Sequence, residues 1–162
     1  MSATTTSGRQ GRLLTLWAPE DKSFWEREGE AIAKLNLWIS VPALFLAFAI
    51  WQVWSVVAVS LPGLGFKYST NQLFWLAAAP ALSGATLRIF YSFMVPLVGG
   101  RRWTAISTAS LLIPAIGIGF AVQDNTTAYP TMLILALLCG LGGGNFSSSM
   151  ANISFFFPKE RK

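Results

Sequence analysis

Long apolar runs alternate with short polar connections along most of the chain. Four of these runs, at residues 35–61, 70–98, 103–122 and 129–158, reach or exceed the ~20 residues that a helix needs to cross about 30 Å of hydrocarbon. The connections between the runs contain glycine, proline, asparagine and charged residues, which typically end helices. The pattern therefore predicts an all-α membrane protein with four transmembrane helices.

Residues 1–34 are more polar and are predicted to form an N-terminal tail. Within this tail, Ser23 followed by Glu26 matches a capping box, which is typical of a helix start. Phe24 and Trp25 begin a set of apolar residues that lie on one side of such a helix. We expect a short amphipathic helix that lies on the membrane surface and leads into the first span. An ordinary polar tail is the alternative.

Composition narrows the classes of function. The chain is 53% apolar and 12% charged, and it contains one cysteine and no histidine. These counts exclude a disulfide within the sequence, a Cys/His zinc site and any catalytic triad that needs an imidazole. We therefore expect no metal, no other cofactor, no catalytic residue and no enzymatic activity.

The basic residues are distributed unevenly among the connections. Ten of them lie on one predicted side of the membrane, whereas the other side has only Lys67. The ten are Arg9, Arg12, Lys22, Arg27, Lys34, Arg101, Arg102, Lys159, Arg161 and Lys162. Because cytoplasmic connections carry the excess of Lys and Arg, the N-terminus is predicted to be cytoplasmic. This distribution also accounts for a pI near 9.8 without a nucleic-acid partner.

Arg88 is the one charged residue that lies inside an apolar run. It is about ten residues, or roughly 15 Å, from the predicted cytoplasmic end of its helix, and no predicted span contains an acidic residue. A cation at that depth costs at least ~2.5–3.5 kcal/mol on insertion scales, so such residues usually face a cavity or a pathway. We expect Arg88 to bind a small oxyanion, because its planar guanidinium can donate two parallel hydrogen bonds. An arginine satisfied by backbone carbonyls, or by acidic groups elsewhere in the protein, is the alternative.

Three residues share the predicted helical face of Arg88. Gly84 precedes it by four positions, and Tyr91 and Ser92 follow it by three and four. The glycine would leave room beside the guanidinium, and the two hydroxyls are placed to orient the guanidinium or a ligand. We therefore treat these three residues as candidate supporting residues of the site.

The fourth run is rich in small and polar residues. Gly140 and Gly144 form a GxxxG pattern, which favours close packing of helices in a membrane. Asn145 is a fourth candidate supporting residue of the site. Together with several serines it makes the run unusually polar, so one face of the run is expected to meet water or other helices. Phe146 is a candidate for contributing its ring to a substrate cavity, with ordinary packing as the alternative.

Several strings of residues resemble a known family. SGATLRIFYSFMVP at 83–96, GGRRWT at 99–104 and NFSSSMANISFFFPK at 145–159 are similar to nitrate/nitrite porters of the major facilitator superfamily. NLWISVP at 36–42 and WAPED at 17–21 resemble the NarK-type bacterial porter in particular. The resemblance covers essentially the whole chain.

The resemblance implies nitrate uptake, nitrite extrusion or both, by antiport or proton coupling, across a bacterial inner membrane. It implies that Arg88 binds the anion and that Phe146 packs on it. It also implies that Gly99, Gly100, Arg101 and Arg102 correspond to the gating connection of these porters. Nitrate, nitrite and the lipid bilayer are the implied partners, and no cofactor is implied.

The resemblance also implies a fold for the complete porter. The four predicted helices correspond to the first part of the N-terminal six-helix half of a major facilitator transporter. The remaining C-terminal part of the porter is therefore an expected partner of residues 35–162, which form a partial transmembrane domain. Two alternatives stay open, a four-helix protein that assembles into an oligomeric anion channel and a membrane fragment that does not transport.

Overall fold

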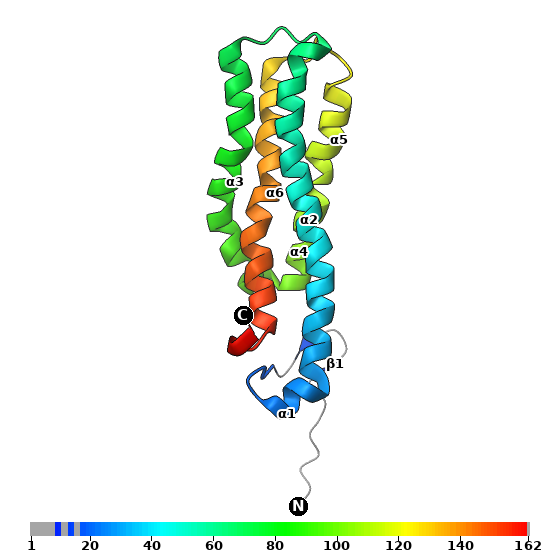
Figure 1. Cartoon of the computed structure of the whole chain (residues 1–162), viewed down its shortest axis with the longest axis vertical. Helices are drawn as coiled ribbons and strands as arrows, with labels where there is room; N and C mark the ends of the chain where they lie inside the picture. The colour runs from blue at the N-terminus through cyan, green and yellow to red at the C-terminus, as the bar shows by residue number, and fades with distance from the viewer. Residues whose placement is uncertain (1–8, 11–12, 15–16, 162) are drawn as a thin grey trace, which may run out of the picture.

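The computed structural model describes residues 9–10, 13–14 and 17–161. Long antiparallel helices form a bundle, and the start of the first long helix lies at the same end as the end of the last one (Figure 1). We call this end of the bundle the tail end and the opposite one the loop end. The basic residues Arg12 and Lys162 of the topology prediction lie outside the described residues.

Helices dominate the described part of the chain. In order, the elements are β1 (Arg9–Gln10), β2 (Leu13–Leu14), α1 (Lys22–Phe24), a π-helical turn (Trp25–Gly29), α2 (Glu30–Ser60), a 3-10 turn (Leu61–Leu64), α3 (Thr70–Val98), α4 (Gly100–Ser110), α5 (Leu112–Ala121), α6 (Tyr129–Phe156) and a 3-10 turn (Lys159–Arg161). The two short strands form one antiparallel pair. Four helical segments are long and apolar enough to cross a membrane, namely Lys22–Leu64, Thr70–Val98, Gly100–Ala121 and Tyr129–Phe156. The predicted all-α membrane fold with four spanning helices is therefore confirmed.

The first span begins inside the predicted tail. Residues Lys22–Leu64 form one continuous helical segment, so no break separates a tail helix from the span. The predicted capping box is wrong, because the N-cap is Asp21 and not Ser23. The Asp21 carboxylate accepts hydrogen bonds from the Ser23 amide, at 2.9 Å, and from the Ser23 hydroxyl, at 2.8 Å. These two bonds hold the pKa of Asp21 below 3.8, its ordinary value. A carboxylate is also favoured over a hydroxyl at this position by the helix dipole.

The third span is interrupted at Leu111, between α4 and α5. Pro114 lies three residues further on, where it has no backbone N–H to donate and its ring displaces the carbonyl of Ser110. The Ser110 hydroxyl donates to the carbonyl of Ser107 at 2.8 Å, which satisfies one polar group next to the break. The hydropathy pattern alone predicted a single uninterrupted helix here.

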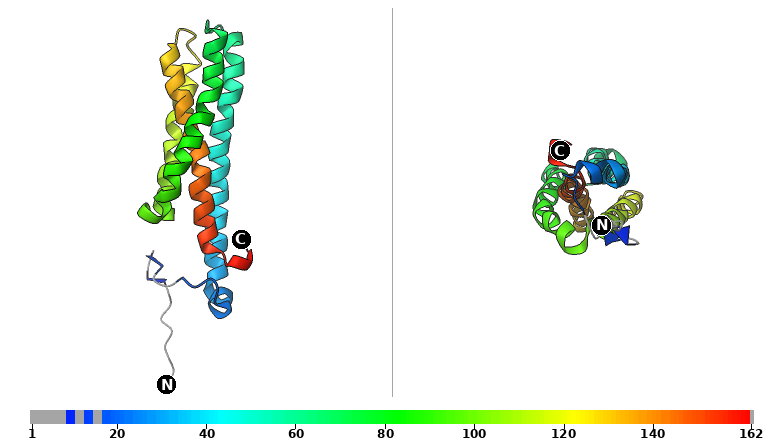
Figure 2. Two further views of the ribbon diagram at one scale, coloured as in Figure 1. Left: turned by 90° about the vertical axis from the view of Figure 1, so that its left-hand side faces the viewer. Right: turned by 90° about the horizontal axis from the view of Figure 1, so that it is seen from below.

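Helix α6 is the central element of the bundle, and α2, α3, α4 and α5 pack around it (Figures 1 and 2). Its approach to α3 requires glycine. A Cβ on Gly140 would lie 2.7 Å from the amide nitrogen of Gly84 and 2.9 Å from the carbonyl oxygen of Pro80, and one on Gly144 would lie 3.0 Å from Cβ of Leu87. The GxxxG pattern therefore serves close helix packing, as expected.

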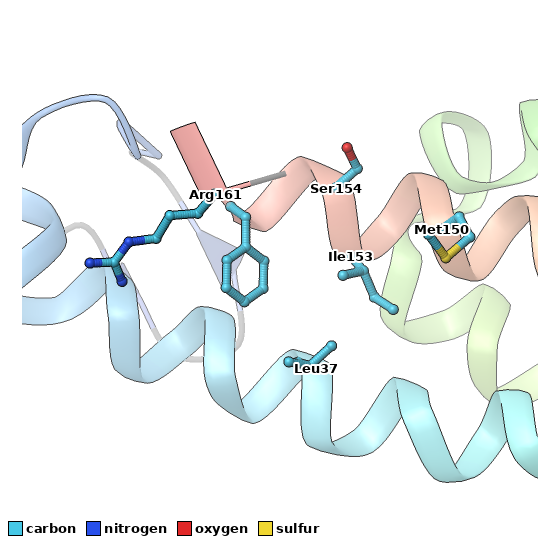
Figure 3. Close-up of a pocket in the computed structure, with 6 residues that line it drawn as sticks. Leu37, Met150, Ile153, Ser154 and Arg161 are labelled. Carbon is cyan, nitrogen blue, oxygen red and sulfur yellow. The ribbon is translucent and has the colours of Figure 1, made fainter. Parts of the chain in front are cut away.

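At the tail end, the segment before α2 contacts the segment after α6. The Trp17 indole donates to the Phe155 carbonyl at 3.2 Å, and the Lys159 amide donates to the Glu20 carboxylate at 3.0 Å. Arg161 lies over the Trp25 ring, with 5.6 Å from Cζ to the ring centroid. We call these contacts, together with the Arg161–Glu30 ion pair at 3.4 Å, the tail clasp. Beside the clasp, a partly open cavity of about 260 Å³ lies between α2 and the C-terminal part of α6 with the residues that follow it (Figure 3). The cavity is lined by Leu37, Met150, Ile153, Ser154, Phe157 and Arg161.

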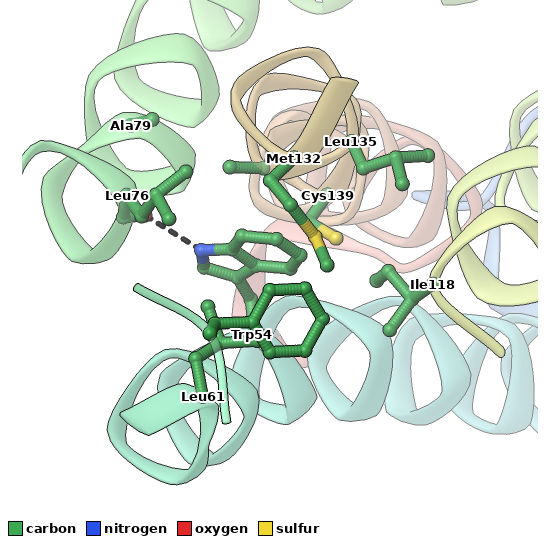
Figure 4. Close-up of a cluster of buried hydrophobic side chains, with 10 residues drawn as sticks. Trp54, Leu61, Leu76, Ala79, Ile118, Met132, Leu135 and Cys139 are labelled. Atoms are coloured by element: carbon green, nitrogen blue, oxygen red, sulfur yellow. Dashed lines mark hydrogen bonds between the residues drawn. The ribbon is translucent and has the colours of Figure 1, made fainter. Parts of the chain in front are cut away.

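The apolar core lies toward the loop end, around Trp54 of α2 (Figure 4). The Trp54 indole donates to the carbonyl of Leu76 at 2.6 Å. In an unbroken helix that carbonyl would accept from the amide of residue 80, but residue 80 is proline and has no N–H. Trp54 supplies the missing donor, so the Leu76 carbonyl is satisfied in an apolar interior where water cannot serve as the donor.

Candidate functional site

Arg88 lies in the middle of α3, where α3 meets α6. Its Nε donates a hydrogen bond to the backbone carbonyl of Gly143 at 3.2 Å. The ion pairs that the described residues form all lie in the segment before α2, at the start of α2 or in the segment after α6, and none of them includes Arg88. One neutral carbonyl does not balance a full charge in apolar surroundings. The environment of Arg88 therefore favours an anionic partner.

Two aromatic side chains, Trp51 of α2 and Phe146 of α6, flank the guanidinium, and Phe48 of α2 packs against both rings. We call these three residues the aromatic frame. Cζ of Arg88 is 5.9 Å from the centroid of the Trp51 ring and 5.8 Å from that of Phe146. The Phe48 ring contacts both others, with centroids 5.7 Å from Trp51 and 6.0 Å from Phe146. Distances within about 6 Å allow cation–π attraction. The frame therefore stabilises the cation without neutralising it.

The guanidinium keeps free donors. Of its five N–H groups, only the one on Nε is engaged with a described residue, through Gly143. Phe146 is 39% exposed, so the site is open to the surface of the bundle on the side of this residue. The two terminal nitrogens can therefore donate to an oxyanion that approaches from that side.

Two of the predicted supporting residues have other partners. Gly84 faces α6, where a Cβ would lie 3.3 Å from the Gly140 carbonyl oxygen and 3.4 Å from Cα of Gly143. The space beside Gly84 is thus filled by α6 and is not free for a ligand. The Ser92 hydroxyl donates to the backbone carbonyl of Arg88 at 2.7 Å, and not to a group that orients the guanidinium.

The other two predicted supporting residues are buried. The Tyr91 ring packs edge-to-face on Trp103, with centroids 4.9 Å apart. Asn145 is 2% exposed, and its side-chain oxygen accepts from the Ser148 hydroxyl at 3.3 Å. Because successive residues of a helix are about 100° apart, Asn145 faces a different side of α6 from Phe146. The structure thus brings Phe146 to Arg88, while Tyr91 and Asn145 make packing and intrahelical contacts.

The predicted gating connection is a very tight turn at the tail end. Only Gly99 separates α3 from α4, and its φ of +88° is a conformation that other residues rarely adopt. A Cβ on Gly100 would overlap the side chain of Asn152, whose amide donates to Asn36 at 3.0 Å. Arg101 and Arg102 are exposed. The turn is therefore packed against α6 through Gly100, and its two cations face outward.

Comparison with known proteins identifies the family. No protein-family model matches the chain. Over 150 residues, or 93% of its length, the chain is 57% identical to the nitrate/nitrite transporter NarU of Salmonella typhimurium and 55% identical to that of Escherichia coli. It is 48% identical over 150 residues to the probable nitrate/nitrite antiporter NarK2 of Thermus thermophilus. The chain belongs to the nitrate/nitrite transporter family. It spans about a third of the length of these curated relatives, 32% or 33%.

The comparisons and the four apolar helices together indicate that the chain is a multi-pass membrane protein. All three relatives are named as transporters or antiporters. The resemblance implied that Arg88 and Phe146 form the anion site, and in the structure these two side chains lie next to each other. Their part in binding stays a prediction.

Sequence reasoning missed three members of this candidate site: Phe48, Trp51 and Gly143. Phe48 and Trp51 lie in an apolar run, where the hydropathy pattern gives both residues the appearance of lipid-facing positions. One signal was present, because tryptophans of membrane helices concentrate at the interfaces and Trp51 lies well inside its run. Gly143 acts through its backbone carbonyl, which leaves no signal in the residue type.

Proposed function

We propose that this chain is the first part of a nitrate/nitrite transporter and that Arg88 binds the transported anion. The observation that carries the proposal is a guanidinium held by aromatic rings at the middle of a spanning helix, with no carboxylate partner among the described residues. The similarity to NarU and NarK2 supports nitrate and nitrite as the substrates. The proposed role is transport and not catalysis.

The chemistry of the site fits a small planar anion. Nitrate and nitrite carry one negative charge, and two of their oxygen atoms can accept parallel hydrogen bonds from the edge of a guanidinium. The Phe146 ring has a positive edge and a negative face, so an anion beside it is favoured at the ring edge. Because the surroundings are apolar, the attraction between anion and Arg88 is stronger than it would be in water.

The proposal includes an orientation in the bacterial inner membrane, with the N-terminus in the cytoplasm. Arg101, Arg102 and Arg161 all belong to the tail end, whereas Lys67 belongs to the loop end. The excess of basic residues at the tail end supports a cytoplasmic position for that end.

The remaining part of the transporter is proposed as the partner that closes the open side of the Arg88 site. Alternating access requires that one half of a transporter moves against another around a central site. Antiport needs only that two anions compete for this site. Proton coupling would need a carboxylate or an imidazole elsewhere, because the apolar runs 35–61, 70–98, 103–122 and 129–158 contain no acidic residue and the sequence has no histidine.

The test is uptake of nitrate into proteoliposomes that contain the complete transporter. We expect Arg88→Gln to abolish uptake and Arg88→Lys to retain only a small part of it, because an ammonium lacks the planar pair of donors. Arg161→Gln is the matched control, since Arg161 also lies over a tryptophan ring but already has Glu30 as its partner. Normal uptake by Arg88→Gln would exclude the proposed site.

A second arm of the experiment addresses the two alternatives. The chain of 162 residues is reconstituted alone, and its nitrate conductance and its size in detergent are measured at several concentrations. Conductance that grows with assembly would favour an oligomeric anion channel. Stable insertion without conductance, together with uptake by the complete transporter, is the result that the proposal predicts.

A further inference from the structure

Trp51 occupies an unusual position for a tryptophan of a membrane helix. It lies inside α2 and is half-buried, at the level of Arg88 and Phe146. Its indole makes no hydrogen bond with a described residue, in contrast to Trp54, whose indole donates to Leu76. A tryptophan in this place is explained by its ring face and not by its N–H group.

The backbone of α6 is shaped to receive the Trp51 ring. A Cβ on Gly143 would lie 3.4 Å from Cε2 and 3.5 Å from Cδ2 of that ring, and one on Gly142 would lie 3.4 Å from Cβ of Trp51 and overlap the carbonyl of Ala47. Only glycine at position 142 lets α2 come this close to α6, because a Cβ there would overlap the carbonyl of Ala47. At position 143 a Cβ would be in van der Waals contact with the indole, so the Trp51 ring lies directly beside this residue.

Gly143 links the ring to the guanidinium. It lies directly beside the Trp51 ring, and its carbonyl accepts the hydrogen bond from Nε of Arg88. The guanidinium is held at Nε by this bond and lies within cation–π distance of Trp51 on α2 and of Phe146 on α6. Because the bond to Gly143 uses only the N–H group on Nε, the four N–H groups on the two terminal nitrogens remain available as donors.

We propose that Trp51 is a positioning residue for anion binding, which acts by holding the Arg88 guanidinium through cation–π attraction. This inference rests on the proposed function of Arg88. Without the ring face, the long arginine side chain samples other rotamers and the Gly143 hydrogen bond alone must fix it. The anion is then bound by a donor pair that is aligned for a smaller part of the time.

The role predicts a specific change in kinetics. We expect Trp51→Leu in the complete transporter to raise KM for nitrate about tenfold, in line with the strength of a partly desolvated cation–π contact. The maximal rate should change little, because the loss of a contact that only orients Arg88 for binding raises KM and leaves the later steps unaffected. Trp51→Phe should restore part of the affinity, since phenylalanine keeps a ring face.

Trp54→Phe is the matched control. Trp54 lies one helical turn beyond Trp51 on the same helix, but it belongs to the core of the loop end and completes the hydrogen bonding of Leu76. We expect Trp54→Phe to lower the midpoint of thermal unfolding and to leave KM unchanged. A general loss of packing in α2 would instead change both properties in both variants.

The decisive experiment replaces Trp51 with tryptophans that carry an increasing number of fluorine atoms. Fluorine withdraws charge from the ring face and hardly changes the shape, so folding is retained. We expect KM for nitrate to rise stepwise with fluorination, and a constant KM would overturn the positioning role. If Arg88→Gln abolishes uptake while the fluorinated series is flat, only this inference fails. If Arg88→Gln transports normally, the proposed function itself fails.

Discussion

The molecule contains two arginine–tryptophan pairs whose difference explains their roles. Arg88 lies 5.9 Å from the Trp51 ring in the middle of the bundle, and Arg161 lies 5.6 Å from the Trp25 ring at the tail end. Arg161 also pairs with Glu30, at 3.4 Å, and its side chain is 57% exposed. Arg88 has a carbonyl in place of a carboxylate.

Both arginines contact a tryptophan ring, but only Arg161 also has a carboxylate as its partner. At the exposed tail end, water and a nearby carboxylate satisfy the cation, and such a pair contributes little stability. Inside the bundle, a fixed carboxylate would satisfy Arg88 permanently and compete with any anion from solution. Leaving this partner out keeps the charge available, so we propose that the first pair serves binding, whereas the second holds two segments together.

The largest predicted effect comes from giving Arg88 the partner that Arg161 has. Phe146→Glu places a carboxylate beside the guanidinium, and nitrate then competes with an internal ion pair. At about 3 kcal/mol for such a pair, we expect nitrate affinity to fall about a hundredfold. Nitrate uptake and the amount of protein in the membrane are measured together. Phe146→Gln, which adds no charge, should lose much less affinity, and equal losses would contradict the electrostatic explanation.

A smaller effect is expected at the glycines that lie beneath the two tryptophans. In Gly143→Ala the new Cβ lies 3.3 Å from Cα of Gly84 and 3.4 Å from the Trp51 ring, so the α3 and α6 backbones must move apart by a few tenths of an ångström. We expect a loss of about 1–3 kcal/mol in the free energy of unfolding, together with a higher KM for nitrate. Denaturant titration in detergent gives the first quantity and uptake kinetics the second.

Gly29→Ala is the control for that substitution at the tail end. Its Cβ would lie 3.1 Å from the Trp25 ring and 3.3 Å from that of Phe24, which are side chains and can shift by a few tenths of an ångström. The change in the free energy of unfolding should stay below about 1 kcal/mol, and KM should not change. A loss as large as that of Gly143→Ala would show that the two tryptophans are held equally tightly.

Removing the carboxylate of the tail clasp should have a still smaller effect. Glu30→Gln ends the ion pairs with Arg161 and with Lys34, which lies at 3.1 Å. Because all three side chains are partly exposed, we expect less than about 1 kcal/mol of destabilisation, and high salt should remove the difference from wild type. Denaturation at low and high ionic strength measures it. A salt-independent loss would mean that the clasp is a buried interaction.

The smallest predicted effect concerns pH and the N-cap Asp21. Its pKa is held below 3.8 by the Ser23 hydroxyl and amide, so the folded state binds this proton more weakly than the unfolded state does. The stabilisation is therefore fully present well above pH 3.8 and is lost as the pH falls through the lowered pKa. The difference in unfolding midpoint between wild type and Asp21→Ala should shrink only under these acidic conditions. A difference that already shrinks near neutral pH would contradict this assignment.

The outcomes at single residues show where sequence reasoning ends. Arg88 was identifiable, because a charge inside an apolar run is rare whatever surrounds it. The cap at Asp21 was missed in favour of Ser23, since both residue types cap helices and local geometry selects between them. Gly84 was expected to leave room for a ligand, but that depended on how closely α6 approaches α3. Trp51 was missed because its ring face acts on a residue 37 positions away in the sequence.

The sequence by itself determined the four spanning helices, the distribution of basic residues and the isolated cation, because hydropathy and charge are properties of single positions and short runs. Only the tertiary structure decided which rings lie beside Arg88 and that the Gly143 carbonyl accepts a hydrogen bond from its Nε. It also decided that the Trp54 indole donates to the Leu76 carbonyl in place of the N–H group that Pro80 lacks. These contacts join residues from different helices, and their distances depend on how closely glycine lets the helix backbones approach. That approach is a property of paired surfaces, which no single segment of the chain specifies.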